Sequence, residues 1–250
     1  MPRIFIACIT LCSAVLIAHA SAVEVRLMGV EVSRNDLYLK QGTEFVSVDI
    51  PLYVNSAYYK AEISEGSLQL YTKIETDEGP RFEVVVEGDF PTGAHSALGI
   101  YFIGPGGQIQ VYFYDDDWST FSKRSYRLIN ISPVSVSSKI EDSLIQVQPF
   151  QSGTVQVEID SNLPLVRVMT VYKDGNDQWK PIYNQRTPFV EDWRITGIAV
   201  VTAGKLDQAM GVPAATGAPD VGKAKLSYFS FKDQESTTAQ KVAERQNSAK

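Results

Sequence analysis

Residues 68–74 read LQLYTKI, a stretch in which apolar or β-branched side chains alternate with polar or amphipathic ones. An alternation with a period of two predicts a β-strand that buries one side and exposes the other. Residues 108–114 (QIQVYFY) repeat the pattern, with Ile109, Val111 and Phe113 on one side. The chain is therefore expected to fold from half-buried antiparallel strands.

Outward from this stretch, similar alternation covers most of the chain. Turn signals rich in Gly, Pro and Asp separate the alternating segments at intervals of about 8 to 12 residues, which favours sandwiches or barrels over βαβ units. No amphipathic helix is expected before residue 235. Strands are predicted near residues 24–30, 36–40, 44–50, 58–63, 67–74, 81–87, 97–103, 108–114, 125–131, 134–140, 144–148, 154–159, 165–173, 179–184 and 195–202.

The predicted strands form two similar sets. Residues 25–27 (VRL) match residues 126–128 (YRL), and residues 98–103 match residues 196–201, with offsets between 96 and 101. We interpret the sets as two tandem immunoglobulin-like antiparallel β-sandwiches, at residues 23–120 and 121–202, joined at the polar stretch 115–125. One continuous sandwich with coincidental similarity is the alternative.

Residues 1–22 have the parts of a signal peptide: a positive start with Arg3, an apolar run at 4–17 and small residues around Ala20. The apolar run is shorter than the ~20 residues that span a bilayer. We therefore expect a secreted or periplasmic protein that is not an integral membrane protein after cleavage. Cleavage would remove both cysteines and one of the two histidines.

That loss shapes the expected chemistry, because most nucleophilic, thiol-redox and soft-metal sites need Cys or His. The sequence predicts no enzyme, and we assign no catalytic, cofactor-binding or metal-binding residue. The run Asp115-Asp116-Asp117 lacks the glycine and the spaced oxygen ligands of a calcium loop, and is interpreted as a solvated turn.

The charge balance bears on possible partners. Without the leader's Arg3, 22 basic residues face 29 acidic ones, a net charge of −7. Nucleic acid is not an expected partner, since phosphate binding requires clustered Lys and Arg. The acidic excess is interpreted as an aid to solubility.

The segment 203–250 departs from the pattern. Its first part, 203–221, is rich in Gly and Pro and reads as a flexible linker, and its end, 234–250, as a disordered tail. Residues 225–232 alternate again and predict one more edge strand. This strand either docks on its own domain or joins the sheet of a partner.

Aromatic side chains are the remaining signal. Exposed flat rings could stack on sugars, as in a carbohydrate-binding module, whereas Tyr and Trp are also common structural residues of strands. The candidate ligand-binding residues are Trp118, Trp179, Trp193, Tyr112 and Tyr114.

Residues 125–136 (SYRLINISPVSV) and 147–153 (VQPFQSG) combine an aromatic-Arg-apolar-x-Asn strand with a Pro-x-x-x-Gly turn. The second repeat thereby resembles small exported bacterial sandwiches, among them the family of the periplasmic alginate O-acetylation accessory protein. The two-domain arrangement resembles secreted tandem β-sandwich proteins of environmental bacteria. The resemblance implies a fold and a role beside exopolysaccharide modification, and it supplies no catalytic residues.

Together these observations predict an exported, non-catalytic binding or assembly protein of the bacterial envelope or exterior. Its expected partners are an envelope protein or a polysaccharide. The alternatives are an accessory protein of exopolysaccharide modification, a carbohydrate-binding module, and a hydrolase that uses a pair of carboxylates.

Overall fold

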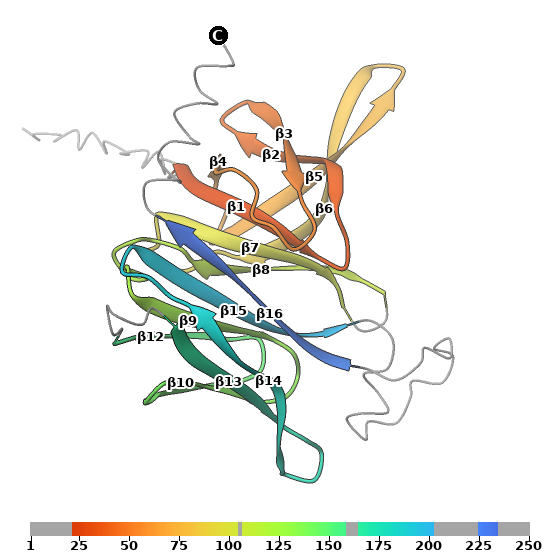
Figure 1. The fold of residues 1–250 in the computed structure, drawn as a ribbon. Helices are drawn as coiled ribbons and strands as arrows, with labels where there is room; N and C mark the ends of the chain where they lie inside the picture. Colours follow the sequence, from red (N-terminus) through yellow and green to blue (C-terminus); the bar gives the residue numbers. More distant parts are fainter. Residues whose placement is uncertain (1–21, 105–106, 159–164, 203–224, 235–250) are drawn as a thin grey trace, which may run out of the picture.

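The computed structural model describes residues 22–104, 107–158, 165–202 and 225–234. Every regular element in these ranges is a strand, and the 16 strands form four sheets of four strands each. The sheets lie in layers, as Figure 1 shows. The predicted all-β fold of two tandem sandwiches is confirmed. Among the described residues, no helix is long and apolar enough to cross a membrane.

The first sandwich consists of sheets A and B. Sheet A has the order β4-β1-β7-β8 and contains β1 (Ala22–Val30), β4 (Tyr59–Glu62), β7 (Ser96–Ile103) and β8 (Ile109–Asp115). Sheet B has the order β3-β2-β5-β6 and contains β2 (Arg34–Gln41), β3 (Glu44–Ile50), β5 (Ser67–Thr76) and β6 (Gly79–Asp89). Alternate residues of both sheets form the core between them, such as Val25 and Leu27 of sheet A and Leu37 and Leu68 of sheet B.

The second sandwich repeats this plan with sheets C and D. Sheet C has the order β12-β9-β15-β16 and contains β9 (Ser125–Ile131), β12 (Ser152–Gln156), β15 (Trp193–Thr202) and β16 (Lys225–Gln234). Sheet D has the order β11-β10-β13-β14 and contains β10 (Val136–Ile140), β11 (Ser143–Val147), β13 (Leu165–Lys173) and β14 (Trp179–Pro188). The core between sheets C and D includes Leu128, Val136, Val168 and Phe189.

Strand order and register make the two sandwiches equivalent element by element. The neighbours in sheets A and C are antiparallel except for one parallel pair in each, β1–β7 and β9–β15. In these pairs Arg26 faces Leu98 and Arg127 faces Thr196, so the two arginines occupy the same place in the repeat. The sequence match between residues 25–27 and 126–128 therefore corresponds to a structural equivalence.

The strand expected near residues 225–232 is β16, and it lies in its own domain. It runs antiparallel to β15 along ten residue pairs, from Trp193↔Gln234 to Thr202↔Lys225. It thereby takes the position in sheet C that β8 has in sheet A. The predicted linker at 203–221 and the tail from 235 lie outside the described residues.

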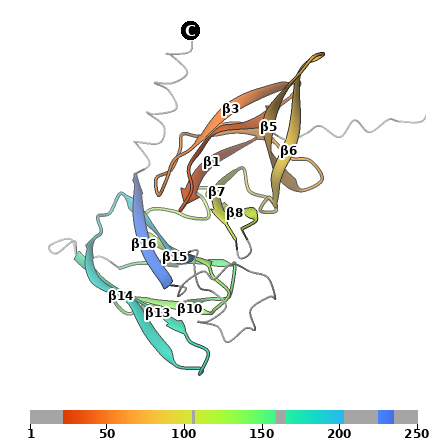
Figure 2. The same ribbon diagram turned by 90° about the vertical axis from the view of Figure 1, so that its right-hand side faces the viewer.

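The four sheets stack in the order B, A, C, D, which Figures 1 and 2 show from two sides. Sheets A and C therefore meet in the middle, and their outward faces form a third apolar core. The fully buried members of this core come from both domains: Met28, Leu98 and Ile100 from the first, and Ile129 and Ile198 from the second. The two sandwiches are thus joined by packing and form one body.

Candidate functional site

The boundary between sheets A and C is built from pairs of equivalent contacts. Tyr53 packs edge-on against Phe229 at 5.1 Å between ring centroids, and Phe150 stacks on Tyr112 at 5.4 Å. In each pair a loop of one domain touches a strand of the other. Tyr53 and Phe150 also share a left-handed backbone, with φ of 55° and 59°. The boundary therefore has a pseudo-two-fold arrangement, like the interface of an isologous dimer.

Asp116, directly after β8, is the centre of a buried ion cluster on this boundary. Its side chain is 0% exposed. Arg26 donates two hydrogen bonds to it, from Nε to Oδ2 at 2.6 Å and from Nη2 to Oδ1 at 3.0 Å. Arg127 and Arg194 of the second domain each donate from Nη2 to Oδ1, at 3.0 and 3.2 Å. The Tyr58 hydroxyl donates to Oδ2 at 2.8 Å.

Asp233 of β16 is the second carboxylate of the cluster and the equivalent of Asp116. Arg26 reaches it with Nη1 at 2.8 Å and Nη2 at 2.5 Å, so this arginine bridges both aspartates. The guanidinium of Arg194 lies 3.8 Å from the centre of the Trp118 ring and 4.7 Å from that of Phe121. The polypeptide that connects the domains thus covers the cluster with its own rings.

The electrostatics of the cluster fix its protonation. Burial alone would raise the pKa of Asp116, but the positive charges of Arg26, Arg127 and Arg194 outweigh burial and hold that pKa well below its usual range. Burial lowers the pKa of Arg127. The pKa of Arg26 is raised, because Asp116 and Asp233 outweigh the opposing effect of burial. Asp116 is therefore an ionised structural anion at neutral pH and has no proton to donate.

The interpretation of residues 115–117 as a solvated turn is wrong for Asp116. The three side chains diverge instead of facing water together. Asp115 Oδ1 accepts the backbone N–H of Asp117, and Asp117 accepts the backbone N–H groups of His95 and Ser96 at 2.9 and 2.7 Å. Asp116 points into the boundary because three arginines of equivalent or neighbouring strands converge there.

The residues of the aromatic-Arg-apolar-x-Asn motif all have structural tasks. Tyr126 is buried in the core of the second sandwich, and Arg127 belongs to the ion cluster. The Asn130 amide donates to the carbonyls of Val134 at 2.7 Å and Gln148 at 3.1 Å, so it holds two turns together. These motif residues therefore help to hold the second sandwich together.

The five candidate ligand-binding residues do not share a surface. Tyr114 is 6% exposed in the A–C core, and Tyr112 is stacked between Phe102 and Phe150. The rings of Trp118 and Trp193 are covered by Arg194 at 3.8 Å and by Lys232 at 3.6 Å. Trp179 is 44% exposed at the start of β14. Most of these ring faces are thus in contact with other groups of the protein.

A different set of rings gathers on the outward face of sheet B, which we call the aromatic face. Phe45 and Phe82 stack at 4.0 Å with only 3° between their planes. Tyr71 contacts Phe45 at 5.0 Å and Tyr38 contacts Phe82 at 5.1 Å, both at steep angles. The four rings are half-buried, and the neighbouring Val84 is 48% exposed. They lie on the side opposite the Leu37 and Leu68 core, away from sheet A.

Polar groups border the aromatic face. Tyr71 donates its hydroxyl to Gln69 at 2.6 Å, and Gln69 donates to Glu87 at 2.9 Å. Burial raises the pKa of Tyr71, and the charges of Glu62 and Glu87 raise it further. Lys73 is paired with Glu75 at 2.5 Å. The border therefore carries both carboxylates and lysines, since Lys73 stands opposite Phe82 and Lys40 stands opposite Phe45 in adjacent strands.

The outward face of sheet D, which we call the basic face, has another character. Lys139 stands between Leu144 and Met169 in adjacent strands, and Arg167 stands opposite Arg186. Leu144 is 68% exposed, the largest exposed fraction among the large apolar side chains described. Basic side chains outnumber acidic ones in these rows, although Glu141 lies beside Arg167 and its carboxylate accepts the backbone N–H of Arg167.

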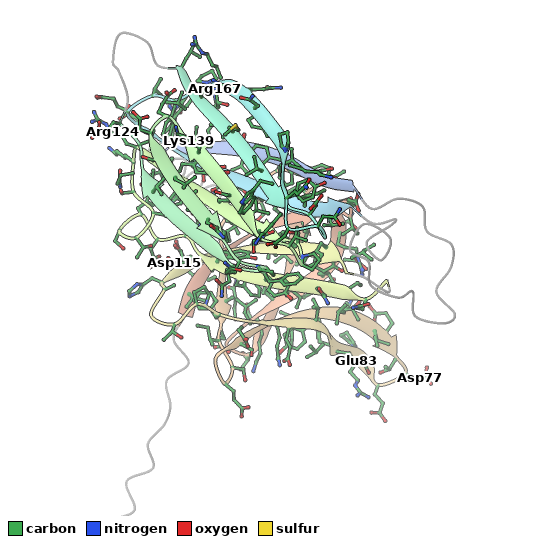
Figure 3. The ribbon with its side chains drawn as sticks, turned by 90° about the horizontal axis from the view of Figure 1, so that it is seen from below. Asp77, Glu83, Asp115, Arg124, Lys139 and Arg167 are labelled. Atoms are coloured by element: carbon green, nitrogen blue, oxygen red, sulfur yellow. The ribbon has the colours of Figure 1, made fainter. Side chains whose placement is uncertain are left out.

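Charge is divided unequally between the two domains. Residues 23–120 contain 16 acidic and 6 basic side chains, a net charge of −10. Residues 121–202 and 225–234 together contain 9 acidic and 11 basic side chains, a net charge of +2. Asp77 and Glu83, on the β5–β6 hairpin, lie at the opposite end of the molecule from Lys139 and Arg167 (Figure 3). The acidic excess that looks diffuse in the sequence is concentrated in one domain.

Sequence reasoning missed the ion cluster and the aromatic face. A signal for the first was the lone arginine inside the apolar runs at residues 25–30 and 126–131, because a charge at such a position needs a buried partner. A signal for the second was Tyr71, an aromatic residue that lies opposite the apolar side in the alternating stretch 68–74.

No known protein-family model matches the chain, and no curated protein is similar to it at a significant level.

Proposed function

We propose that the protein is an exported, non-catalytic binding or assembly protein of the bacterial envelope or exterior, and that it binds through the aromatic face. One observation carries the proposal. Tyr38, Phe45, Tyr71 and Phe82 gather on the outward side of a sheet whose inward side already supplies a complete core. Aromatic side chains that the core does not require, next to an exposed Val84, are typical of interaction surfaces.

The alternative of a hydrolase with two carboxylates finds no support in the buried pair. Asp116 and Asp233 belong to one buried cluster, but both are bound by Arg26. A general acid requires a raised pKa, whereas the arginines lower that of Asp116. Within the described residues, no group of three or more His, Cys, Asp or Glu side chains is placed to hold a metal ion.

A protein partner suits the aromatic face better than a sugar. Stacking on a sugar needs a free ring face, but Phe45 and Phe82 each cover one face of the other and each also contacts a tyrosine. Their exposed parts together with Val84 offer an apolar surface bordered by polar groups. This arrangement is that of a protein–protein interface, with an apolar centre and a polar rim.

Export is part of the proposal and is supported by the leader-like residues 1–22. The rigid junction of the two sandwiches supports the assembly role, because the apolar A–C core and the ion cluster would hold the aromatic face and the basic face at fixed positions.

The test is retention of the protein in the envelope of its producing cells after washing. Val84→Lys places a charge on the aromatic face, and we expect it to release most of the protein into the wash. Ile74→Lys is the matched control, since Ile74 is 37% exposed on the other side of the same hairpin, and it should be retained like the wild type. Equal retention of Val84→Lys and wild type would contradict the proposal.

A further inference from the structure

The aromatic face and the basic face complement each other, and they lie in different domains of the same chain. The aromatic face exposes Val84 beside carboxylates such as Glu87 and belongs to the domain of charge −10. The basic face exposes Leu144 beside Lys139 and Arg167. Each face has an apolar part, and the domains that carry the two faces have net charges of opposite sign, −10 and +2.

From this complementarity we propose that the partner of the aromatic face is a second copy of the chain, which docks with its basic face. The inference rests on the proposed function insofar as it uses the same aromatic face. It adds the identity of the occupant and a direction, since the contact joins two different faces.

The charges of the domains select this head-to-tail arrangement. If two copies met through their aromatic faces, their N-terminal domains would repel each other, because each has a net charge of −10. A basic face placed on an aromatic face instead brings Lys139, Arg167 and Arg186 to a domain with a net charge of −10. Opposite charges at the contact both favour the encounter and fix the orientation of the partners.

A packing of two outward sheet faces, like the one proposed, already occurs within the chain. Sheets A and C already pack with their outward faces together. A basic face on an aromatic face would continue the order B, A, C, D with sheet B of the next copy. Pairing of the edge strand β14 is a weaker route to assembly, because Pro181 and Pro188 cannot donate backbone hydrogen bonds.

A contact between two different faces leaves one of each free, so it produces open chains and not a closed dimer. Purified mature protein should therefore show an average mass in sedimentation velocity that rises steadily with concentration. A wild-type protein that stays monomeric over the whole accessible concentration range would overturn the inference.

Two variants, each altered on one face, sharpen the test. Val84→Lys should no longer accept a basic face, and Leu144→Glu should no longer dock on an aromatic face. Both residues are exposed, so each variant should melt at the wild-type temperature. Each alone should sediment as a monomer, with association weakened at least tenfold.

Mixing the two variants gives the decisive result. Val84→Lys retains a working basic face and Leu144→Glu a working aromatic face, so an equimolar mixture should form one-to-one dimers and nothing larger. A mixture that remains monomeric, or a single variant that still assembles, would contradict the head-to-tail contact. Monomeric wild type together with loss of envelope retention in Val84→Lys would refute the second copy as occupant and leave the proposed function standing. If the mixture forms dimers but Val84→Lys is retained in the envelope like the wild type, the proposed function is refuted and the head-to-tail contact stands.

Discussion

The outward faces of sheets A and C are sealed against each other, whereas the outward faces of sheets B and D meet solvent. All four sheets have four strands, and each buries its inward face in a sandwich core. On the outward side, β1 and β7 present Met28 and Ile100, which are 0% exposed, while β2 and β5 present half-buried Tyr38 and Tyr71. Topology alone therefore does not decide which face becomes an interface.

The side chains at the outward positions determine which face becomes an interface. The sealed faces combine apolar rows with a fully paired Asp116, and exposing such a surface to water costs free energy. The open faces mix rings or aliphatic side chains with charges that remain in water. The first kind of face suits permanent packing between domains, and the second suits association that can form and dissolve.

Breaking the ion cluster is expected to have the largest effect on the sealed boundary. Asp116→Ala leaves Arg26, Arg127 and Arg194 buried with Asp233 as the remaining carboxylate of the cluster. Removing one partner of a buried ion pair costs about 3–5 kcal/mol in the free energy of unfolding, which urea titration at neutral pH measures.

The control for this variant is Asp36→Ala. Asp36 pairs with Arg34 at 2.7 Å, but its side chain is 57% exposed, and exposed pairs contribute about 0–1 kcal/mol. Similar losses in the two variants would mean that the buried cluster contributes no more than a surface pair.

A smaller effect is expected from the apolar part of the boundary. Ile198→Ala removes a side chain that is 0% exposed between sheets A and C, and such truncations cost about 2–5 kcal/mol. Leu144→Ala, at an open face, should stay within about 0.5 kcal/mol of the wild type. Equal losses in urea unfolding would show that the A–C boundary is not a core.

Strand positions were predictable because the period-two pattern reflects burial on one side. The segment expected at 44–50 is β3 (Glu44–Ile50), and that expected at 165–173 is β13 (Leu165–Lys173). The equivalence of β1 and β9 also followed from sequence, since an arginine between apolar residues is a conspicuous match. These features depend on local sequence and on repetition within the chain.

The A–C boundary was not predicted, although residues 126–131 carried a signal of it. This stretch, YRLINI, shows no alternation, and all seven residues of β9 are buried. Apolar residues on both sides of a strand indicate that both faces are covered. What one sequence cannot supply is the identity of the covering element. Asp116 was misread for the same reason, because its three arginines come from strands distant in sequence.

The smallest predicted effect concerns Tyr114, a polar group inside the sealed boundary. Its hydroxyl is buried and has no hydrogen-bond partner, and burial raises its pKa, with Tyr112 contributing further. The folded protein therefore resists ionisation of this phenol, whereas the unfolded chain ionises near pH 10. Ionisation of Tyr114 in the unfolded chain therefore leaves the free energy of unfolding unaffected below about pH 10 and lowers it by up to about 1.4 kcal/mol per pH unit above that. Tyr114→Phe should make this alkaline fall shallower, and at pH 7 it should leave the free energy of unfolding unchanged or higher by about 1 kcal/mol, since an unsatisfied hydroxyl is removed. Urea unfolding of both proteins at pH 7, 10 and 11 measures the difference. An alkaline slope identical to that of the wild type, or a loss of stability at pH 7, would indicate that the hydroxyl is in contact with water and that the boundary is less tightly sealed than its apolar packing implies.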